Sequence, residues 1–505
     1  MILLTAVLLV ILPGRAQQKS QTDIQKTIKV LAIGNSFSED AVEQNLHEIA
    51  AADGVTMIVG NLYIGGCSID RHVQNIQKDA AAYAYRKVNA KGVKTSTKDT
   101  PLSKAIVDEK WDYVSVQQVS GLSGQLQSYG SLPVLVKWVR EKAPQAHLLF
   151  HQTWAYASDS KHADFKRYDN SQQQMTGAIR YATTQAANNV GITTIVPSLK
   201  AIYYARQSMP ESDITRDGYH LNKRFARYIA AATWYATISG KPVSGNTYCP
   251  ENMTAEELQI AQQAADWAVF GPQLAKRKIQ VLKPQNRRGI YRRCKNGGKS
   301  ISVLGGTHAA DSLSVLAKQM WANSLHSKVT SYAVEGAGLA QGQGYDLQRQ
   351  ADEARVSDIY VLWLSNEDYL WCQLLGDTAS YSAKDGYSAK SRLTQCGGLN
   401  YCIQKLREKN PKATIYVFAP LDDSNGVNGT LISTKRNAVG YSMAESIQVL
   451  KKCCARQGVR VLNQVVLDMH PTNEVCTCYQ SDGVRLTETA YKKVAPTQAR
   501  FLSGE

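Results

Sequence analysis

The residues with the clearest chemistry are a serine near the start of the chain and an aspartate–histidine pair far downstream. Ser36 follows a glycine-containing turn after the apolar run of residues 28–33, and Asp217 and His220 lie three positions apart. A serine hydroxyl attacks esters poorly by itself, so it needs a base within hydrogen-bond reach and a third group that orients this base. These residues together predict a Ser36–His220–Asp217 triad with Ser36 as the nucleophile.

The elements that must position these residues alternate between strands and helices. Helical patterns cover residues 40–53 and 225–235, and Thr254 begins a capped closing helix. Glu39 and Asp40 are expected to cap and charge the first of these helices. Strands separated by helices are typical of a parallel sheet covered on both faces, with the catalytic turns at the carboxyl ends of its strands. The expected strands are residues 28–33, 55–63, 112–117, 146–151 and 192–196.

A nucleophilic serine early in the chain and an Asp-x-x-His near the end of the domain resemble the SGNH (GDSL-like) hydrolase superfamily. Within it, the sequence is most similar to the secreted esterase-like branch found in gut bacteria. The usual Gly-Asp-Ser is Gly34-Asn35-Ser36 here, and Asp217 and His220 match the family's last motif in full. The resemblance covers about residues 27–270. It implies a flavodoxin-like, three-layer α/β/α fold with a central parallel sheet.

The resemblance also implies an oxyanion hole, which stabilises the negative charge that develops on the substrate oxygen. The family places a glycine turn and then an Asn-bearing turn between the nucleophile and the base. Gly66 is the expected backbone donor, with Gly65 as the alternative, and the N–H of Ser36 is the second donor. No Asn follows the third strand. The side-chain amide of Gln118, or that of Gln117, is therefore expected to take its place.

Three polar or aromatic residues lie at the end of the fourth expected strand, at the same edge of the sheet. They are His151, Gln152 and Trp154. A tryptophan ring can stack on a sugar, and the other two side chains can contact hydroxyl groups. These residues are expected to bind substrate. The alternative for Trp154 is that it only packs a loop.

The length of the chain predicts more than one domain, because 505 residues are too many for a single core. Residues 27–270 form the expected catalytic domain. Residues 271–298 contain prolines, paired glycines and a basic cluster, and are expected to be a linker. Residues 299–505 repeat the order of strands and turns of the first half, and are expected to be a second, degenerate SGNH-like α/β/α domain.

The second half lacks the residues that the chemistry needs. Thr307 stands where the nucleophile should be, and Arg485, three residues after Asp482, stands where the base should be. Arginine stays protonated in proteins and cannot accept the proton of a hydroxyl. The second domain is therefore expected to be catalytically inactive. Its possible roles are to bind glycan, to complete the substrate cleft, or to stabilise the first domain.

The start of the chain indicates export. Residues 1–16 are a short apolar run that ends in small residues, which is typical of a cleaved signal peptide and too short to span a bilayer. No later segment has the length and apolar character of a membrane span. We therefore expect a secreted or periplasmic protein.

Cysteine usage and charge add weaker constraints. Eight of the ten cysteines lie between Cys294 and Cys478, which favours disulfides in an exported domain, with buried free thiols as the alternative. No His follows Cys476 or Cys478 at ligand spacing, so no metal is expected. The net charge of +16 favours polyanionic partners. Its basic residues form no recognisable nucleic-acid module, so nucleic acid is not an expected partner.

These features together predict a cofactor-independent, exported serine esterase that removes acyl groups, most simply acetyl, from a polysaccharide. The carbohydrate substrate rests on the family resemblance and on export, whereas ester hydrolysis rests on the triad. One alternative is a lipase or arylesterase; the absence of a long apolar lid segment and the 26 tyrosines against 7 phenylalanines favour a polar cleft instead. Another alternative is a glycan-binding protein with vestigial activity.

Overall fold

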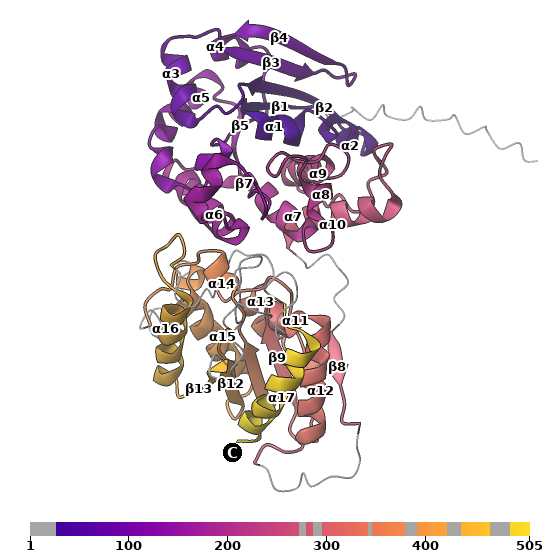
Figure 1. Cartoon of the computed structure of the whole chain (residues 1–505), viewed down its shortest axis with the longest axis vertical. Helices are drawn as coiled ribbons and strands as arrows, with labels where there is room; N and C mark the ends of the chain where they lie inside the picture. Colours follow the sequence, from indigo (N-terminus) through magenta and orange to yellow (C-terminus); the bar gives the residue numbers. More distant parts are fainter. Residues whose placement is uncertain are drawn as a thin grey trace, which may run out of the picture.

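The structure is a computed structural model in which two helix-covered sheets lie one above the other along the longest axis (Figure 1). The expected signal peptide, Asp482 and three of the cysteines (Cys294, Cys476 and Cys478) lie outside the described residues. In the part of the chain that is described, no helix is both long enough and apolar enough to cross a bilayer. The described residues are 27–271, 279–285, 295–341, 346–378, 391–421, 436–464 and 485–504.

The first domain is built on a seven-stranded sheet of order β4-β3-β2-β1-β5-β6-β7. Its parallel strands follow the order 2-1-3-4-5 among themselves, which is the flavodoxin-like arrangement. All five expected strands are present. They are β1 (Thr27–Gly34), β2 (Thr56–Tyr63), β5 (Tyr113–Val116), β6 (His147–His151) and β7 (Thr194–Val196).

An antiparallel extension of this sheet was not expected. β3 (Tyr83–Val88) pairs antiparallel with β2, and β4 (Lys94–Thr100) pairs antiparallel with β3. Six of the seven residues of β4 are exposed. Because an edge strand of this kind buries no face, it lacks the alternation of apolar and polar residues by which strands are recognised in a sequence.

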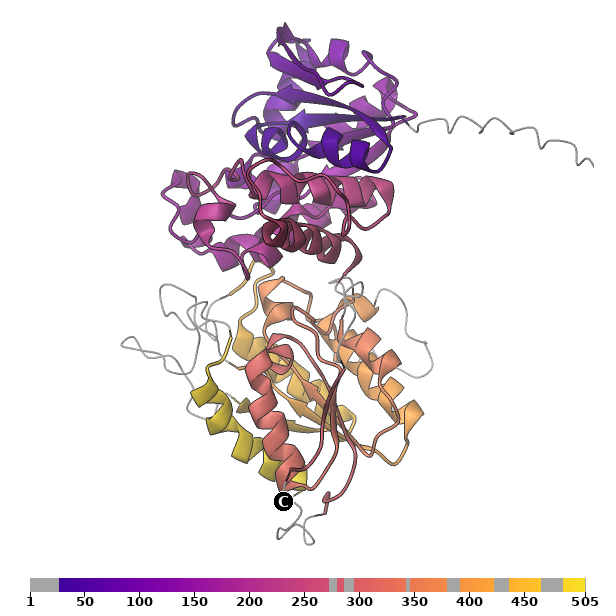
Figure 2. The ribbon, with the colours of Figure 1, turned by 90° about the vertical axis from the view of Figure 1, so that its right-hand side faces the viewer.

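Helices cover both faces of the first sheet, as expected for an α/β/α domain (Figure 2). Alternate residues of β1 point to opposite cores: Val30 and Ala32 to one, Leu31 and Ile33 to the other. α6 (Gln172–Asn189) contributes to both cores, and α8 (Glu211–Ile214) precedes the Asp217 turn. One core receives α1 (Ser36–Val42), α2 (Leu46–Ala52), α7 (Ser198–Ala205), α9 (Ala226–Ser239) and α10 (Ala255–Phe270), and the other receives α3 (Ile69–Gln77), α4 (Leu102–Ala105) and α5 (Leu132–Lys142).

Two helix predictions can be compared directly with the structure. The helix expected over residues 40–53 is two helices, separated at Asn45, whose φ of 72° places it in the left-handed region. The closing helix begins with the expected capping box: the Thr254 hydroxyl accepts the Glu257 N–H, and the Glu257 carboxylate accepts the Thr254 N–H. A cap is a local signal, whereas a break inside a helix depends on the packing around it.

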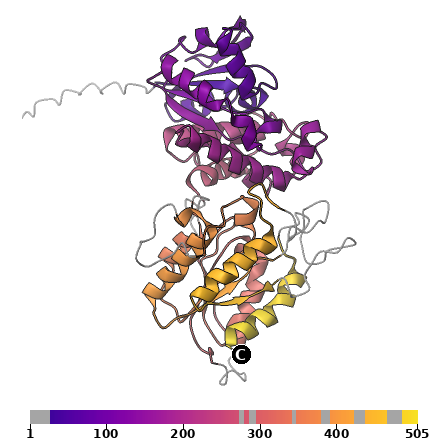
Figure 3. The same ribbon diagram turned by 90° about the vertical axis from the view of Figure 1, so that its left-hand side faces the viewer.

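The second domain has the same arrangement of parallel strands as the first. Its order is β13-β12-β11-β9-β10-β8, and β9 to β13 again follow 2-1-3-4-5 among themselves. Helices cover both faces (Figure 3). The strands are β8 (Gln280–Leu282), β9 (Ile301–Gly305), β10 (Val329–Ser331), β11 (Ile359–Trp363), β12 (Thr414–Phe418) and β13 (Arg460–Leu462). The helices are α11 (Thr307–Ala310), α12 (Val315–Ser324), α13 (Leu347–Glu353), α14 (Glu367–Leu370), α15 (Gln395–Lys409), α16 (Met443–Arg456) and α17 (Glu488–Ser503).

Two features of the second domain differ from the expectation. β8 lies inside the range expected to be linker, and it pairs antiparallel with β10, so this sheet includes residues before 299. The described cysteines form no disulfide; most are buried and pack as small apolar side chains. The free cysteines are Cys67, Cys249, Cys372, Cys396, Cys402, Cys453 and Cys454.

The two domains contact each other through α6 and α7 of the first and the carboxyl-terminal edge of the second sheet. The ring of Tyr203 on α7 lies 5.0 Å from that of Trp371, which packs against the core of the first domain. On α6, burial lowers the pKa of Arg180. Burial also raises the pKa of Asp368, a nearby carboxyl of the second domain, to about 6. This edge of the second domain therefore serves as an interface.

Gly177 of α6 provides a test of this interface. A Cβ atom there would lie 2.2 Å from the carbonyl oxygen of Leu370. Overpacking of this kind costs about 1–3 kcal/mol, which exceeds the gain of about 1 kcal/mol that alanine offers over glycine inside a helix. We expect Gly177→Ala to lower the thermal midpoint. Gly130→Ala is the control, because its nearest atom would be 3.9 Å away. A Gly177→Ala protein more stable than wild type would contradict the interface.

Candidate active site

The nucleophile is held by a buried asparagine that connects three loops. Ser36 is the first residue of α1, directly after β1, and Asn35 is the N-cap, whose Oδ1 accepts the Phe37 N–H at 3.0 Å. The same Oδ1 accepts the Gln117 amide at 2.8 Å, and Asn35 Nδ2 donates to the Cys67 carbonyl at 3.0 Å. Asn35 therefore joins the turn of the nucleophile to the loops that follow β2 and β5. Asn35 thus has a structural role in this turn.

The expected base and orienting acid lie beside the nucleophile. His220 Nε2 is 2.9 Å from Ser36 Oγ, and His220 Nδ1 is 2.7 Å from Asp217 Oδ2. Gly218 has a φ of 86°, a conformation that favours glycine, and it lets the chain turn back between the acid and the base. Because the Asp217 carboxylate only accepts, Nδ1 carries the proton and Nε2 is free to accept the proton of Ser36.

Asp217 is kept ionised by the loop around it. Partial burial opposes ionisation, but the His220 ring and the N–H groups of His220 and Tyr219 donate to the carboxylate and lower its pKa. The side chain of Asp217 is 39% exposed and that of His220 is 17% exposed. Ser36 is half-buried. The three groups thus lie at an open surface.

The two backbone N–H groups predicted for the oxyanion hole belong to Ser36 and Gly66. The turn at residues 64–67 is closed by a hydrogen bond from the Cys67 N–H to the Ile64 carbonyl at 3.2 Å, and Gly66 has a φ of 63°. Gly66 is exposed. Within the described residues, neither the Ser36 N–H nor the Gly66 N–H donates to a protein acceptor. Both are therefore available to a substrate oxygen.

The side chain of Gln118 does not supply the third donor that the sequence predicts. Its Nε2 donates to the carbonyl and to the hydroxyl of Ser128, at 2.8 and 3.1 Å. Its Oε1 accepts the N–H of Ile69 at 3.0 Å and that of Val119 at 2.9 Å. Both amide protons are already used, so Gln118 supports the loop after the Gly66 turn instead. The alternative residue, Gln117, is also engaged, because its amide donates to Asn35.

His151 and Gln152, predicted to contact substrate hydroxyls, lie in the interior instead. The His151 ring joins Gln117 Oε1 at 2.7 Å to the Ser198 hydroxyl at 3.1 Å, and burial lowers its pKa to about 3. Gln152 donates to the Thr183 hydroxyl at 2.7 Å. Both residues are buried. Their hydrogen bonds hold the ends of β5 and β6 in place, and neither side chain is exposed to solvent.

Trp154 also packs inside, which is the alternative that the sequence left open. Its ring stacks on Phe37 with centroids 4.3 Å apart, and its N–H donates to the Tyr219 carbonyl at 2.8 Å. The side chain is fully buried. Trp154 therefore supports the helix of the nucleophile and the loop of the base, and it does not face the substrate.

A different aromatic pair lies beside the catalytic imidazole. The Tyr219 ring is 4.2 Å from His220 and 4.7 Å from His162, and both Tyr219 and His162 are only partly buried. Tyr219 lies inside the Asp-x-x-His segment, so the sequence could have drawn attention to it. His162 belongs to the loop after β6 and carried no such signal.

The corresponding edge of the second domain holds no equivalent triad among its described residues. Thr307 begins α11 as Ser36 begins α1, but its N–H donates to Glu367 Oε1 at 2.7 Å and its hydroxyl accepts the Gly336 N–H at 3.2 Å. Arg485 forms an ion pair with Glu335. In the described ranges, no three metal-ligating side chains gather at either edge or elsewhere.

Comparisons with known proteins concern the first domain. Residues 29–268 match the family model described as "Domain of unknown function (DUF4886)". A solved DUF4886 family protein from Bacteroides uniformis is 52% identical over 49% of this chain and 96% of that chain, with a TM-score of 0.48. A comparison with curated proteins finds no match.

More distant solved structures also match this half. The lipase/acylhydrolase from Enterococcus faecalis is 14% identical over 41% of this chain and 96% of that one, with a TM-score of 0.28. A protein assigned as a GDSL-like lipase from Bacteroides uniformis is 11% identical over 41% and 97%, with a TM-score of 0.30. Identities this low say nothing about chemistry, which has to come from the site itself.

The buried His151 predicts a pH dependence of stability. Its pKa is about 3 in the folded protein, against an ordinary value of 6.5. Between these values the unfolded chain binds a proton that the folded chain does not, so the free energy of unfolding falls as the pH decreases from about 6.5 toward 3. We expect His151→Gln to flatten this slope by up to about 1.4 kcal/mol per pH unit, measured by urea unfolding. His147→Gln is the control, because His147 lies on the same strand and is exposed. An equal change of the slope in this variant would show that burial of His151 is not its cause.

Proposed function

We infer that this chain, which belongs to the DUF4886 family, is a serine hydrolase in which Ser36 attacks an ester carbonyl. The observation that supports this most strongly is the pair of short contacts made by His220, 2.9 Å to Ser36 and 2.7 Å to Asp217. Ser36 and the Asp217–His220 loop lie far apart in the sequence. The fold therefore brings together the three groups that this chemistry needs.

The proposed reaction has two halves. His220 Nε2 takes the proton of Ser36 as the hydroxyl attacks the carbonyl, and Asp217 stabilises the imidazolium that forms. The N–H groups of Ser36 and Gly66 donate to the oxyanion. The imidazolium then protonates the leaving alcohol, and an acyl group stays on Ser36. Water, activated by the same imidazole, releases the acid and restores the enzyme.

We propose that the substrate is an acylated, most simply acetylated, polysaccharide, and that the protein acts outside the cytoplasm. The apolar leader at residues 1–16 supports export. The open triad, with Asp217 39% exposed, suits a bulky polymer. The partly buried rings of Tyr219 and His162 offer a face on which a sugar can stack.

The alternatives make different demands on the site. A lipase or arylesterase would act on hydrophobic esters as readily as on carbohydrate esters. A glycan-binding protein would not need the contacts between Ser36, His220 and Asp217. The second domain gives little support to glycan binding, because the carboxyl-terminal edge of its sheet packs on α6 and α7. Two assays separate the carbohydrate esterase, the lipase or arylesterase, and the glycan-binding protein. One measures release of acetate from acetylated xylan and pectin, and the other measures hydrolysis of 4-nitrophenyl esters of short and long acids.

The triad predicts a graded loss of activity. We expect Ser36→Ala and His220→Ala each to lower kcat on 4-nitrophenyl acetate by about 10⁴- to 10⁶-fold, and Asp217→Ala by somewhat less, with thermal midpoints near that of wild type. Circular dichroism checks the fold of each variant. Near-normal turnover by a folded Ser36→Ala protein would show that Ser36 is not the nucleophile.

The aromatic pair predicts selectivity for sugar esters. We expect Tyr219→Ala to raise KM for acetylated xylo-oligosaccharides about 3- to 10-fold, because a stacking contact of about 0.5–1.5 kcal/mol is lost, while KM for 4-nitrophenyl acetate changes little. Tyr219→Phe keeps the ring and is the matched control. Equal changes in KM for both substrates would argue against a sugar subsite at Tyr219.

A further inference from the structure

We propose that Asp40 is a positioning residue that holds the catalytic loop, residues 216–221, against the helix that carries Ser36. This role rests on the serine hydrolase function proposed above and adds a residue to it. Asp40 lies on α1, four residues after Ser36, and its side chain is fully buried. It touches none of the reacting atoms, so it acts through the placement of His220.

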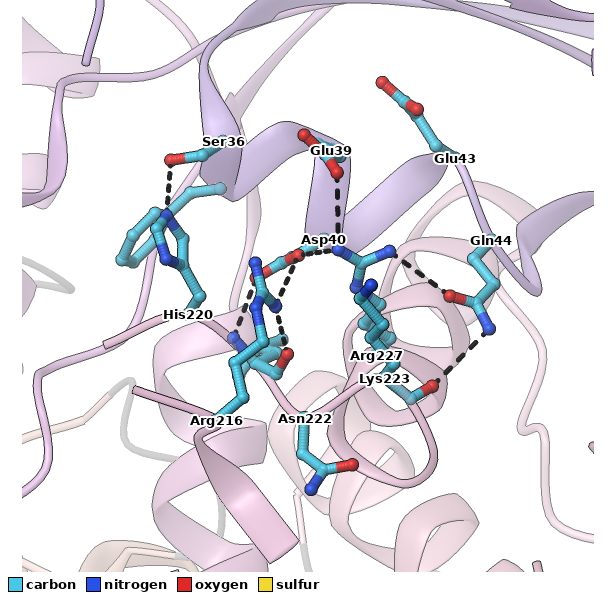
Figure 4. Close-up of polar contacts among 12 residues, drawn as sticks. Ser36, Glu39, Asp40, Glu43, Gln44, Arg216, His220, Asn222, Lys223 and Arg227 are labelled. Carbon is cyan, nitrogen blue, oxygen red and sulfur yellow. Dashed lines mark hydrogen bonds and ion pairs between the residues drawn. The ribbon is translucent and has the colours of Figure 1, made fainter. Parts of the chain in front are cut away.

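The carboxylate of Asp40 contacts the catalytic loop at both of its ends. Asp40 Oδ2 accepts the N–H of Leu221, the residue after His220, at 2.7 Å. Both carboxylate oxygens lie 3.1 Å from Nη1 of Arg216, the residue before Asp217. Figure 4 shows these contacts beneath the Ser36–His220 hydrogen bond. One side chain thus fixes the two residues that flank the acid and the base.

The catalytic loop is itself a closed unit. The Arg216 N–H donates to the His220 carbonyl at 2.9 Å, and Thr215 and Leu221 form an antiparallel bridge. The guanidinium of Arg216 also donates to the Leu221 carbonyl. Because these bonds make the loop move as one body, a shift of Leu221 relative to α1 also shifts the imidazole relative to Ser36.

A second guanidinium fixes the carboxylate from the other side. Arg227 of α9 forms an ion pair with Asp40, and its Nη2 lies 3.4 Å from Glu39 Oε1 (Figure 4). Burial raises the pKa of Asp40, against the opposing effects of Arg227 and Arg216. Removing one partner of such a buried group leaves an uncompensated charge, which is strongly unfavourable. The carboxylate therefore has one well-defined position between the two arginines.

The catalytic loop needs this support because one side of it faces solvent. Asp217 is 39% exposed, so packing of its side chain contributes little to the position of the loop. The sequence predicts that Asp40 caps and charges α1, but its contacts go to the loop and to Arg227. The N-terminal cap is Asn35 instead. The Asp40 carboxylate, one turn after Ser36, thus helps to fix the distance between Ser36 Oγ and His220 Nε2.

The test compares two neutralised carboxylates of the same region. Asp40→Asn keeps the size of the side chain and removes its charge. Glu43→Gln is the matched control, because Glu43 caps the other end of α1, its side chain is 2% exposed, and it pairs with Arg86 and Lys94 without touching the catalytic loop. We expect both substitutions to destabilise the protein, because each neutralises a buried, paired carboxylate. Only the loss at Asp40 is expected to move His220.

Two readouts separate positioning from stability. The first is kcat and KM on 4-nitrophenyl acetate. The second is the rate at which a fluorophosphonate ester modifies Ser36, with loss of fluoride and transfer of the serine proton to His220. We expect Asp40→Asn to lower kcat and the modification rate by about 10- to 100-fold with KM unchanged, since a displacement of about 1 Å has effects of this size. Glu43→Gln should retain both rates within about twofold.

Arg216→Gln provides the second variant, because Arg216 is partly exposed and its loss leaves the Leu221 contact in place. We expect a 3- to 10-fold loss of kcat, and no further loss when it is combined with Asp40→Asn. The proposal is overturned if Asp40→Asn matches Glu43→Gln in both readouts. If Asp40→Asn does not fold, an unchanged kcat in Arg216→Gln overturns it. Failure of wild-type Ser36 to react with the fluorophosphonate is a different result and contradicts the hydrolase function itself.

Discussion

The hydrogen bond between His220 Nε2 and Ser36 Oγ joins two residues 184 positions apart, and the first domain is organised around it. Ser36 is positioned by β1 and by the N-cap Asn35. His220 is positioned by the loop that precedes α9. A hydrogen bond of this kind tolerates little displacement. The buried contacts of Asp40 and Asn35 therefore belong to the proposed catalytic arrangement together with Ser36 and His220.

The sequence predicts this arrangement well where the signal is local or where the chemistry restricts residue types. The five parallel strands are short apolar runs, and only a few residue types can form a triad; the structure places Ser36, His220 and Asp217 in contact. The prediction is weaker where a side chain has more than one use. Gln118 has the right chemistry for an oxyanion donor, but its protons go to Ser128. Which partner an amide meets depends on tertiary packing, which spacing alone does not reveal.

Burial explains the remaining differences. His151 ends β6 and Trp154 lies three residues later, but both side chains are buried and contact residues behind the site. Tyr219, which is only partly buried, lies beside the imidazole instead. The β3–β4 hairpin was missed for the opposite reason, because its outer strand is almost wholly exposed. Sequence patterns report on burial only when a segment has one buried and one exposed face.

The interface between the domains covers part of the carboxyl-terminal edge of the second sheet. The Tyr204 ring lies against Gly336, whose N–H donates to Thr307, and Arg485 contacts Gln207 just after α7. Thr307 and Arg485 therefore lie next to or at this interface, so a substitution at either position also alters the surroundings of the contact between the domains. The residues at this edge of the second domain are for that reason constrained by the neighbouring domain as well as by their own fold.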